Sequence, residues 1–388
     1  MTVTTALAAC GSSTSTTTTH AQTASGVNRG TQVSTRSNTA PTADSTGTLD
    51  PSRFTPTNVS VVAGETLPQI FAMGSPWNQP VDTLPVDPNS AQLLTLASQR
   101  IGAVEVPGQS GVVTQRRFVP DGVFINTTRW TDPVVTDQAG AATKVFCRQR
   151  FCGPDAVGLS SLTLPTGVNP DPRFDGWFTA INTQLDVAYD LWRARRQVDG
   201  SISFQYVKKW NLAGSGYQSP YNVSARGSGL PLFAGMITLA DLRSGQINHA
   251  LAISVPGPSQ RNFVTPASST DGNGSVNSLP EGARIRLKAN TLLGKTPSGA
   301  SRRLADAIVV ALVRYGAIVV DRSAVPTLYA QKDVAARFLQ GNEIQSLHLS
   351  DFQVVGLPPR IAYPNPKVTQ VGPQFTPTTF GFGGGGGG

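Results

Sequence analysis

The sequence predicts a mainly β protein with a few helices, folded as a single domain of the β-sandwich or jelly-roll type. Charged residues make up only 14% of the 388 residues, against about a quarter in ordinary globular domains. The chain holds 39 glycines and 29 prolines, which mark frequent turns. Short segments of alternating apolar and polar residues recur between these turns and indicate strands.

Composition divides the chain into four segments. Residues 1–10 resemble the remnant of a signal peptide that ends in a lipobox. Residues 11–62 are dominated by Ser, Thr, Ala and Gly and cannot bury enough apolar surface to offset their ordering entropy, which predicts a disordered tether. Residues 63–365 form the predicted β-rich domain. Residues 366–388 end in a run of glycine and are expected to be a disordered tail.

Three short helices are predicted within the domain. The turn residues 87–90 provide N-cap chemistry for a helix over residues 91–99, and a second short helix is expected at 239–244. Residues 301–315 have an apolar stripe at helical spacing. Gly316 follows in the position of a left-handed C-cap.

Residues 185–192 alternate with period two, which predicts a strand with one buried and one polar face. Asp186, Asp190 and Trp192 share the polar face. The Asp199-Gly200 pair predicts a hairpin that returns the chain as a partner strand over residues 201–210.

Three further strands carry candidate residues. His249 begins a strand over residues 249–255 and shares its apolar face. Residues 283–289 place Arg284 and Arg286 on an outward basic face. Residues 317–320 are apolar on both faces, which is typical of a central strand, and this strand ends at Asp321.

The three cysteines predict an extracellular location. Cys10 closes the run Leu7-Ala8-Ala9-Cys10, which is similar to a bacterial lipobox, so we expect lipidation there. No Lys or Arg precedes it, so either the natural start lies upstream or the match arose by chance. Secretion would let Cys147 and Cys152 pair as a disulfide. We expect the protein outside the cell or on the outer face of the envelope, held to a membrane only through Cys10.

Charge and missing motifs exclude several function classes. The net charge of +8 is scattered, which argues against nucleic acid and fits attraction to anionic envelope polymers. The sequence has no P-loop, no HExxH and no GxSxG, and its two histidines outside the tether exclude a site of three. We assign no metal site and no cofactor, and we expect a monomer that acts on or binds polysaccharide.

Carboxylates remain as candidate catalytic groups, because glycoside hydrolysis needs two of them. Asp190 is the first candidate, with Trp192 beside it as a platform for sugar stacking. Asp186 lies four strand residues from Asp190, which corresponds to roughly 13 Å. This distance exceeds the roughly 5–9.5 Å between the two catalytic carboxyl groups of a glycosidase. The options for a partner are Asp241, Asp271, Glu281 and Asp321. The alternative is an exposed acidic strand with an ordinary half-buried tryptophan.

The other candidate residues each have two interpretations. His249 is either a structural histidine or a general base beside Asp190, and Tyr189 or Tyr217 as proton donor would then suit a lyase. Arg284 and Arg286 could neutralise an acidic sugar or form a solvated face. Asp321 is a site residue or the cap of the next turn. Trp77, in the turn-rich loop 74–80, is a further candidate for substrate binding.

Several phrases resemble a family of largely uncharacterised secreted bacterial proteins. The resemblance extends from about residue 74 to 355 and implies an extracellular β-rich domain that works on polysaccharide. It rests on Gly74-Ser75-Pro76-Trp77-Asn78, Tyr189-Asp190-Leu191-Trp192, Ser228-Gly229-Leu230-Pro231-Leu232-Phe233-Ala234-Gly235, His249-Ala250-Leu251, Gly282-Ala283-Arg284-Ile285-Arg286-Leu287 and Tyr315-Gly316-Ala317-Ile318-Val319-Val320-Asp321.

Two functions are therefore predicted. The first, which we favour, is a secreted carbohydrate-active hydrolase or lyase. The second is a non-catalytic envelope lipoprotein that binds glycan or a partner protein.

Overall fold

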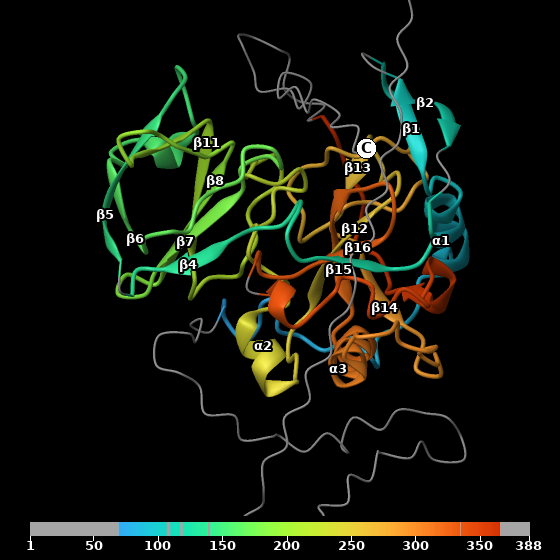
Figure 1. Cartoon of the computed structure of the whole chain (residues 1–388). Helices are drawn as coiled ribbons and strands as arrows, with labels where there is room; N and C mark the ends of the chain where they lie inside the picture. Colours follow the sequence, from blue (N-terminus) through green and yellow to red (C-terminus); the bar gives the residue numbers. More distant parts are fainter. Residues whose placement is uncertain (1–69, 107–108, 117–118, 139, 334, 365–388) are drawn as a thin grey trace, which may run out of the picture. The chain divides into compact units, whose positions relative to one another are not determined.

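The computed structural model describes residues 70–106, 109–116, 119–138, 140–333 and 335–364 (Figure 1). The predicted lipidation site Cys10, the tether 11–62 and the tail 366–388 lie outside the described residues. The fold is mainly β with a few helices, in a sandwich-like arrangement, as the sequence predicts. No helix in these ranges is long and apolar enough to cross a membrane.

The largest sheet has six strands in the order β17-β14-β15-β12-β16-β3. Its strands are β3 (Phe124–Asn126), β12 (Leu251–Val255), β14 (Arg284–Leu287), β15 (Ala317–Arg322), β16 (Thr327–Tyr329) and β17 (Phe352–Val354). The sheet is mixed, because β12 is parallel to β15 and antiparallel to β16. In Figure 1 its strands are coloured yellow to red, except β3.

Helices cover one face of this sheet. They are α1 (Ser90–Ser98), α2 (Leu239–Ser244) and α3 (Arg302–Arg314), all close to the predicted ranges. In α3, the Ser301 side chain accepts a hydrogen bond from the Leu304 N–H, and Gly316 just beyond the C-cap has the left-handed φ of 65°. The apolar faces of α1 and α3 share one hydrophobic core with alternate residues of β12 and β15.

Two four-stranded sheets are formed by the strands that lie between β3 and β12 in the sequence. The first, β11-β8-β7-β4, contains β4 (Val134–Thr136), β7 (Phe178–Asn182), β8 (Val187–Trp192) and β11 (Tyr206–Asn211). The second, β6-β5-β10-β9, contains β5 (Ala141–Cys147), β6 (Ser161–Leu164), β9 (Arg195–Arg196) and β10 (Ile202–Phe204). Two small sheets pair β1 (Ala103–Val106) with β2 (Gln109–Arg116) and β13 (Asn262–Phe263) with β18 (Ile361–Ala362).

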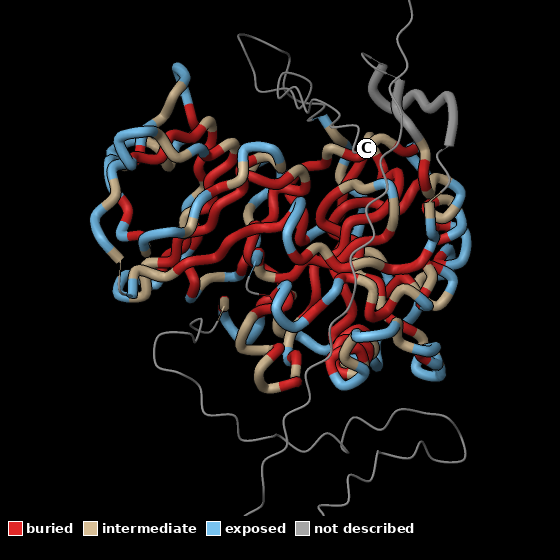
Figure 2. The backbone as a smooth tube through the Cα atoms, in the orientation of Figure 1, coloured by how far each residue is buried: buried red, intermediate tan, exposed pale blue. Residues whose placement is uncertain are grey.

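Strand β8 belongs to two hydrophobic cores at once. Ala188 and Trp192 pack in a core with Ile318 of β15, whereas Leu191 packs with Phe204 of the neighbouring sheet. The strand was expected to have one polar face, and this expectation is wrong because each face is covered by another sheet. Figure 2 shows the resulting buried strands in red.

Two local predictions need correction in their bounds. The strand at 185–192 begins only at Val187, because Asp186 has a left-handed φ of 50° and belongs to the preceding turn. The expected partner strand 201–210 is divided at Gln205. Its first part is β10, which pairs with β5 and β9, and its second part is β11, which pairs with β8.

The predicted disulfide between Cys147 and Cys152 is present. It joins the end of β5 to the short 3₁₀ turn over Pro154–Ala156 and closes a loop with a sequence separation of five. The Cα atoms lie 5.8 Å apart, within the usual range for a bridge.

Candidate functional site

Three carboxylates, two of them on buried residues and the third on the half-buried Asp271, converge beside the end of strand β15. Asp271, Glu281 and Asp321 each offer one oxygen atom, and these three atoms lie within 4.8 Å of one another. Asp271 and Glu281 belong to the long connection between β13 and β14, so residues distant in sequence form the group. We call these three residues the carboxylate cluster.

A β-bulge places Asp321 in the carboxylate cluster. Ile253 pairs with Val319 and Ser254 pairs with Asp321, so Val320 is the extra residue in β15. Strict alternation would direct Asp321 to the face of Val319, which is packed against α3. The extra residue reverses this direction, and the Asp321 carboxylate lies 3.9 Å from the Arg226 guanidinium on the opposite face.

Glu281 is fixed by contacts on both sides. Its side chain is fully buried, and its Oε2 accepts a hydrogen bond from the Asp271 N–H at 3.3 Å. Its backbone carbonyl accepts from the Val264 N–H. Gly282 follows with φ of 87°, and a Cβ there would lie 1.8 Å from the Val264 carbonyl oxygen, so only glycine lets the chain turn here.

Asp271 lies between a glycine and an arginine. A Cβ on Gly227 would come within 2.3 Å of the Asp271 carboxyl group, so the loop approaches this side chain as closely as glycine permits. On the other side, Asp271 Oδ2 lies 3.4 Å from Arg322 Nε. The positive charge of Arg322 stabilises negative charge on Asp271.

Arg226 provides the central positive charge of the site. Its side chain is fully buried, with the guanidinium 4.8 Å from the ring centroid of Tyr329 and 5.6 Å from that of Trp177. Nη1 donates to the Pro231 carbonyl, while Nε and Nη2 have no hydrogen-bond partner among the described residues. The two rings are neighbours, with centroids 6.2 Å apart, and both contact the guanidinium.

Burial shifts the pKa values of the cluster toward the protonated forms. Burial, together with the neighbouring Asp271, raises the pKa of Glu281 and of Asp321 well above their ordinary values. Arg226 acts in the opposite direction on Asp321. The physical reason is that a charge loses its hydration on burial, and a nearby like charge adds repulsion. Both effects favour the protonated forms of Glu281 and Asp321 more than water does.

A second acidic pair, Asp132 and Asp190, joins the site through Arg226. Asp190 Oδ2 accepts from the Trp210 indole N–H at 2.8 Å and from the Leu232 N–H at 2.7 Å. The Thr179 hydroxyl contacts Asp190 Oδ1 at 2.6 Å and also contacts Asp132. Burial raises the pKa of Asp190 to about 6, while its hydrogen bonds and Arg226 limit the rise.

Thr179 lies between the two acids and has one hydroxyl hydrogen, so it can donate to only one of them at a time. A proton on the other carboxyl group would complete the second contact. Burial and the charge of Asp190 raise the pKa of Asp132 well above its ordinary value, which favours Asp132 as the acid that carries this proton.

The structure does not bring His249 to Asp190. Both ring nitrogens are engaged elsewhere: Nε2 lies 3.2 Å from Asp241 Oδ2, and Nδ1 lies 2.9 Å from the Ala250 carbonyl. Burial opposes the charged imidazolium, but Asp241 outweighs burial and raises the pKa of His249. The strand begins at Leu251, so His249 lies two residues before β12, and its contacts join this segment to α2 and fit the structural interpretation of His249.

The predicted sugar-binding tryptophans lack an exposed ring face. Trp192 is 4% exposed and Trp77 is 2% exposed, and the Trp77 indole N–H donates to the Gly216 carbonyl at 3.0 Å. A stacking platform needs an open face, which neither residue has. Asp186 is exposed in its turn, away from the polar contacts of Asp190 described above.

The two predicted substrate-binding arginines instead hold the N-terminal loop of the domain. Arg284 donates to the carbonyls of Tyr315, Pro76 and Gln79, and Arg286 donates to that of Val81. Burial lowers the pKa of Arg284 to about 10. The expected outward basic face is thus covered by residues 76–81.

Within the described ranges, the carboxylate cluster is the group of side chains that could hold a metal ion. Its ligands are oxygen atoms, which suit calcium or magnesium. Arg226 and Arg322 already contact two of the three carboxylates, so a cation would meet two positive charges at close range. A proton bound to a carboxylate of the cluster would neutralise its negative charge without placing a cation beside the two arginines.

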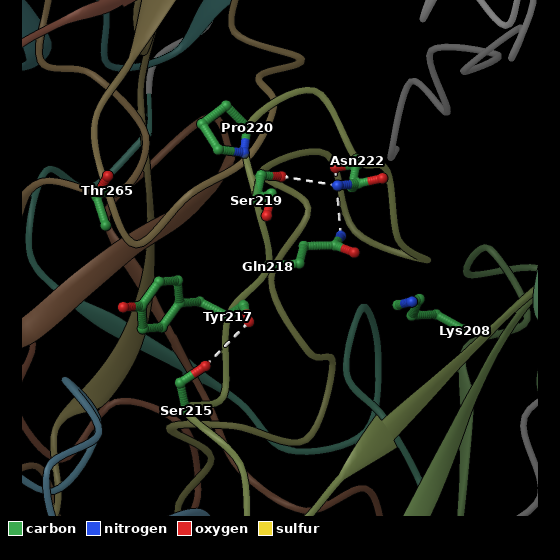
Figure 3. A pocket seen from close by; sticks show the side chains of 8 residues that line it. All are labelled: Lys208, Ser215, Tyr217, Gln218, Ser219, Pro220, Asn222 and Thr265. Carbon is green, nitrogen blue, oxygen red and sulfur yellow. Dashed lines mark hydrogen bonds between the residues drawn. The ribbon is translucent and has the colours of Figure 1, made fainter.

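A polar surface hollow of about 570 Å³ lies apart from the carboxylate cluster (Figure 3). Its lining residues are Lys208, Ser215, Tyr217, Gln218, Ser219, Pro220, Asn222 and Thr265. Tyr217, a candidate proton donor from the sequence, belongs to this lining and not to the carboxylate cluster. We call this site the surface hollow.

Comparison with known family models, with curated proteins and with solved structures finds no match. Of the sequence candidates, Asp190 and Asp321 lie in this neighbourhood, and Asp271 and Glu281 were among the options for a partner. Arg226, Thr179 and Asp132 were missed, because no local pattern marks them.

Proposed function

We propose that this protein is a secreted carbohydrate-active hydrolase whose reaction takes place at the carboxylate cluster. The observation that supports it is the approach of Asp271, Glu281 and Asp321 within 4.8 Å, with pKa values of two members raised by burial. Hydrolysis of a glycosidic bond requires one protonated and one ionised carboxyl group in such proximity. Buried pairs with perturbed pKa values are typical of catalytic acids and bases.

Asp321 is the proposed general acid and Asp271 the proposed nucleophile. Asp321 would give its proton to the glycosidic oxygen while Asp271, ionised opposite Arg322, attacks the anomeric carbon and forms a glycosyl ester. Water would then attack the same carbon, lose its proton to Asp321 and release Asp271. Protons and charges balance over the two steps.

The spacing favours retention of anomeric configuration. Retaining enzymes place their carboxyl groups about 5–5.5 Å apart, whereas inverting enzymes need about 6.5–9.5 Å to admit water. One oxygen atom of each carboxyl group lies within 4.8 Å of the others, which favours the shorter separation of the retaining enzymes. Glu281, fully buried, would position Asp271 and would not touch substrate.

Access would come from the side of Asp321 and Arg322. The Asp321 side chain is 12% exposed and that of Arg322 is 24% exposed, while that of Asp271 is 6% exposed. A sugar would therefore approach Asp321 first. Arg226, which contacts two aromatic rings, would balance the negative charge of the ionised carboxylate during the reaction.

The test is release of reducing sugar from a panel of plant, fungal and bacterial wall polysaccharides by the full chain. We expect D321N and D271N to lower kcat at least a hundredfold. D306N is the control, because Asp306 pairs with Arg302 on the surface of α3. Product followed by NMR should show the retained anomer first. No release from any polymer by the intact chain would overturn the proposal.

Binding without cleavage is the second candidate, as an envelope protein that holds glycan or a partner. The observation that favours it is the burial of Glu281 and near burial of Asp271, which leave little room for a polymer at the carboxylates. Retention on an insoluble polysaccharide without any sugar release would support this function over the first.

A further inference from the structure

The surface hollow has the dimensions of a small-molecule subsite. Its volume of about 570 Å³ lies within the roughly 300–1,000 Å³ of typical ligand pockets. Figure 3 shows hydroxyl, amide and phenol groups around it, with Lys208 reaching it from β11 and most other residues from loop 215–222. Tyr217 is 38% exposed and offers a ring to a ligand.

Internal hydrogen bonds hold this lining in place. Gln218 Nε2 lies 3.2, 3.1 and 2.9 Å from the carbonyl oxygens of Asn222, Val223 and Gly229, which share its two N–H hydrogens. Asn222 Nδ2 donates to the Ser219 carbonyl at 3.0 Å. The loop is therefore fixed before any ligand arrives, which lowers the entropic cost of binding.

The surface hollow and the carboxylate cluster are built on the same two loops. The Ser268 hydroxyl donates to the Asn222 carbonyl at 2.6 Å, and the Tyr221 N–H donates to the Ser268 carbonyl at 2.6 Å. Further along the same segments, Gly227 packs directly on Asp271. Thr265 lines the hollow six residues before Asp271 enters the cluster. A chain bound in the hollow would thus lie against loops that position the carboxylates.

The charge of the hollow favours a neutral ligand. Lys208, its one charged lining residue, is paired with Asp155 at 3.1 Å and lies over the Trp210 ring. The groups that the lining offers to a ligand are then the exposed phenol ring of Tyr217 and the hydroxyl groups of Ser215, Ser219 and Thr265. An aromatic ring beside hydroxyl and amide groups matches the apolar face and hydroxyl rim of a hexose.

We infer that the surface hollow is a binding subsite for neutral hexose units of an oligosaccharide. The inference rests on the proposed function for the assignment of saccharide as the ligand class. Tyr217 stacks on the sugar ring, and the fixed loop 215–222 contributes hydrogen bonds to its hydroxyl groups. The subsite holds the polymer while the carboxylate cluster acts on it.

The test is calorimetric titration of the full chain with cellohexaose, maltohexaose, N-acetylchitohexaose and polygalacturonate. We expect one of the three neutral probes to bind and Y217A to weaken that binding about tenfold. F338A is the matched control, because Phe338 is 37% exposed, close to the 38% of Tyr217, and does not line the hollow. Binding of polygalacturonate alone, equal affinity in Y217A, or no binding of any neutral probe would overturn the inference.

The outcome is separable from that of the proposed function. D321N should keep the affinity of the intact chain for the bound hexaose while losing sugar release. If sugar is released but Y217A leaves both affinity and KM unchanged, the subsite inference fails and the hydrolase stands. If a hexaose binds through Tyr217 but no polymer is cleaved, the subsite stands and the hydrolase fails.

Discussion

Replacing Asp190 by Asn should flatten the pH dependence of stability. Burial raises the pKa of Asp190 from 3.8 to about 6 in the folded protein. Each pKa unit corresponds to about 1.4 kcal/mol, so the ionised form of Asp190 is disfavoured by about 3 kcal/mol relative to the unfolded chain. Because the folded pKa is the higher one, the folded state binds more protons between pH 4 and 6, and stability falls as pH rises through this window.

The contacts of Asp190 make asparagine a fitting substitute. Its amide oxygen can accept from Trp210 and Leu232, while its NH₂ group donates to Thr179, whose own hydrogen then turns to Asp132. Asp132 no longer needs a proton, so its contribution to the pH dependence falls in the same direction. D190N should therefore fold with its hydrogen bonds intact.

The assay is urea unfolding with the disulfide intact, followed by tryptophan fluorescence from pH 4 to pH 7.5. We expect the free energy of unfolding of the intact chain to fall over this range by about 2.4 kcal/mol more than that of D190N, because the window starts just above the unfolded pKa. D186N, which changes an exposed acid next to β8, should follow the intact chain. Parallel pH curves for the intact chain and D190N would refute the assignment of Asp190 as a buried, reluctantly ionised acid.

Three further changes have defined outcomes. G227A adds a methyl group within 2.3 Å of the Asp271 carboxyl group, so we expect a loss of about 1–3 kcal/mol in urea unfolding and loss of any sugar release. T238A removes the capping-box hydroxyl of α2 and should cost about 1 kcal/mol by the same assay. The double variant C147S/C152S opens a short loop and should cost about 2 kcal/mol, which thiol reduction of the intact chain should reproduce.

Local signals in the sequence predicted the local structure. Helix α3 begins and ends within a residue or two of the range predicted from the N-cap at Ser301 and from Gly316. Such caps can be predicted because they depend on nearby backbone groups. The apolar run before Asp321 predicted a central strand, because a strand that is packed on both faces shows no polar alternation.

The burial of β8 could not be predicted from its alternation. Asp190 and Trp192 look like an exposed face because one is charged and the other is large and amphipathic. Both are buried because the strand lies between two other sheets, and the Asp190 carboxyl group is satisfied by Thr179, Trp210 and Leu232. These partners come from β7, β11 and a loop, and no local pattern reports such pairings.

The candidate site depends on a single extra residue. Period-two alternation would have assigned Asp321 to the face of α3, whereas the bulge at Val320 turns it toward Arg226. The sequence could name Asp321, Asp271 and Glu281 as acids worth testing. It could not show that they meet, because the bulge and the connection between β13 and β14 are properties of the folded chain.

Exposure decides which acid of the carboxylate cluster can act as the general acid. Burial and the nearby Asp271 raise the pKa of Glu281 and of Asp321, while Arg226 acts in the opposite direction on Asp321. Glu281 is fully buried, whereas the Asp321 side chain is 12% exposed. Of the two acids whose protonated form burial favours, Asp321 is therefore the one that a substrate can reach, as a general acid requires.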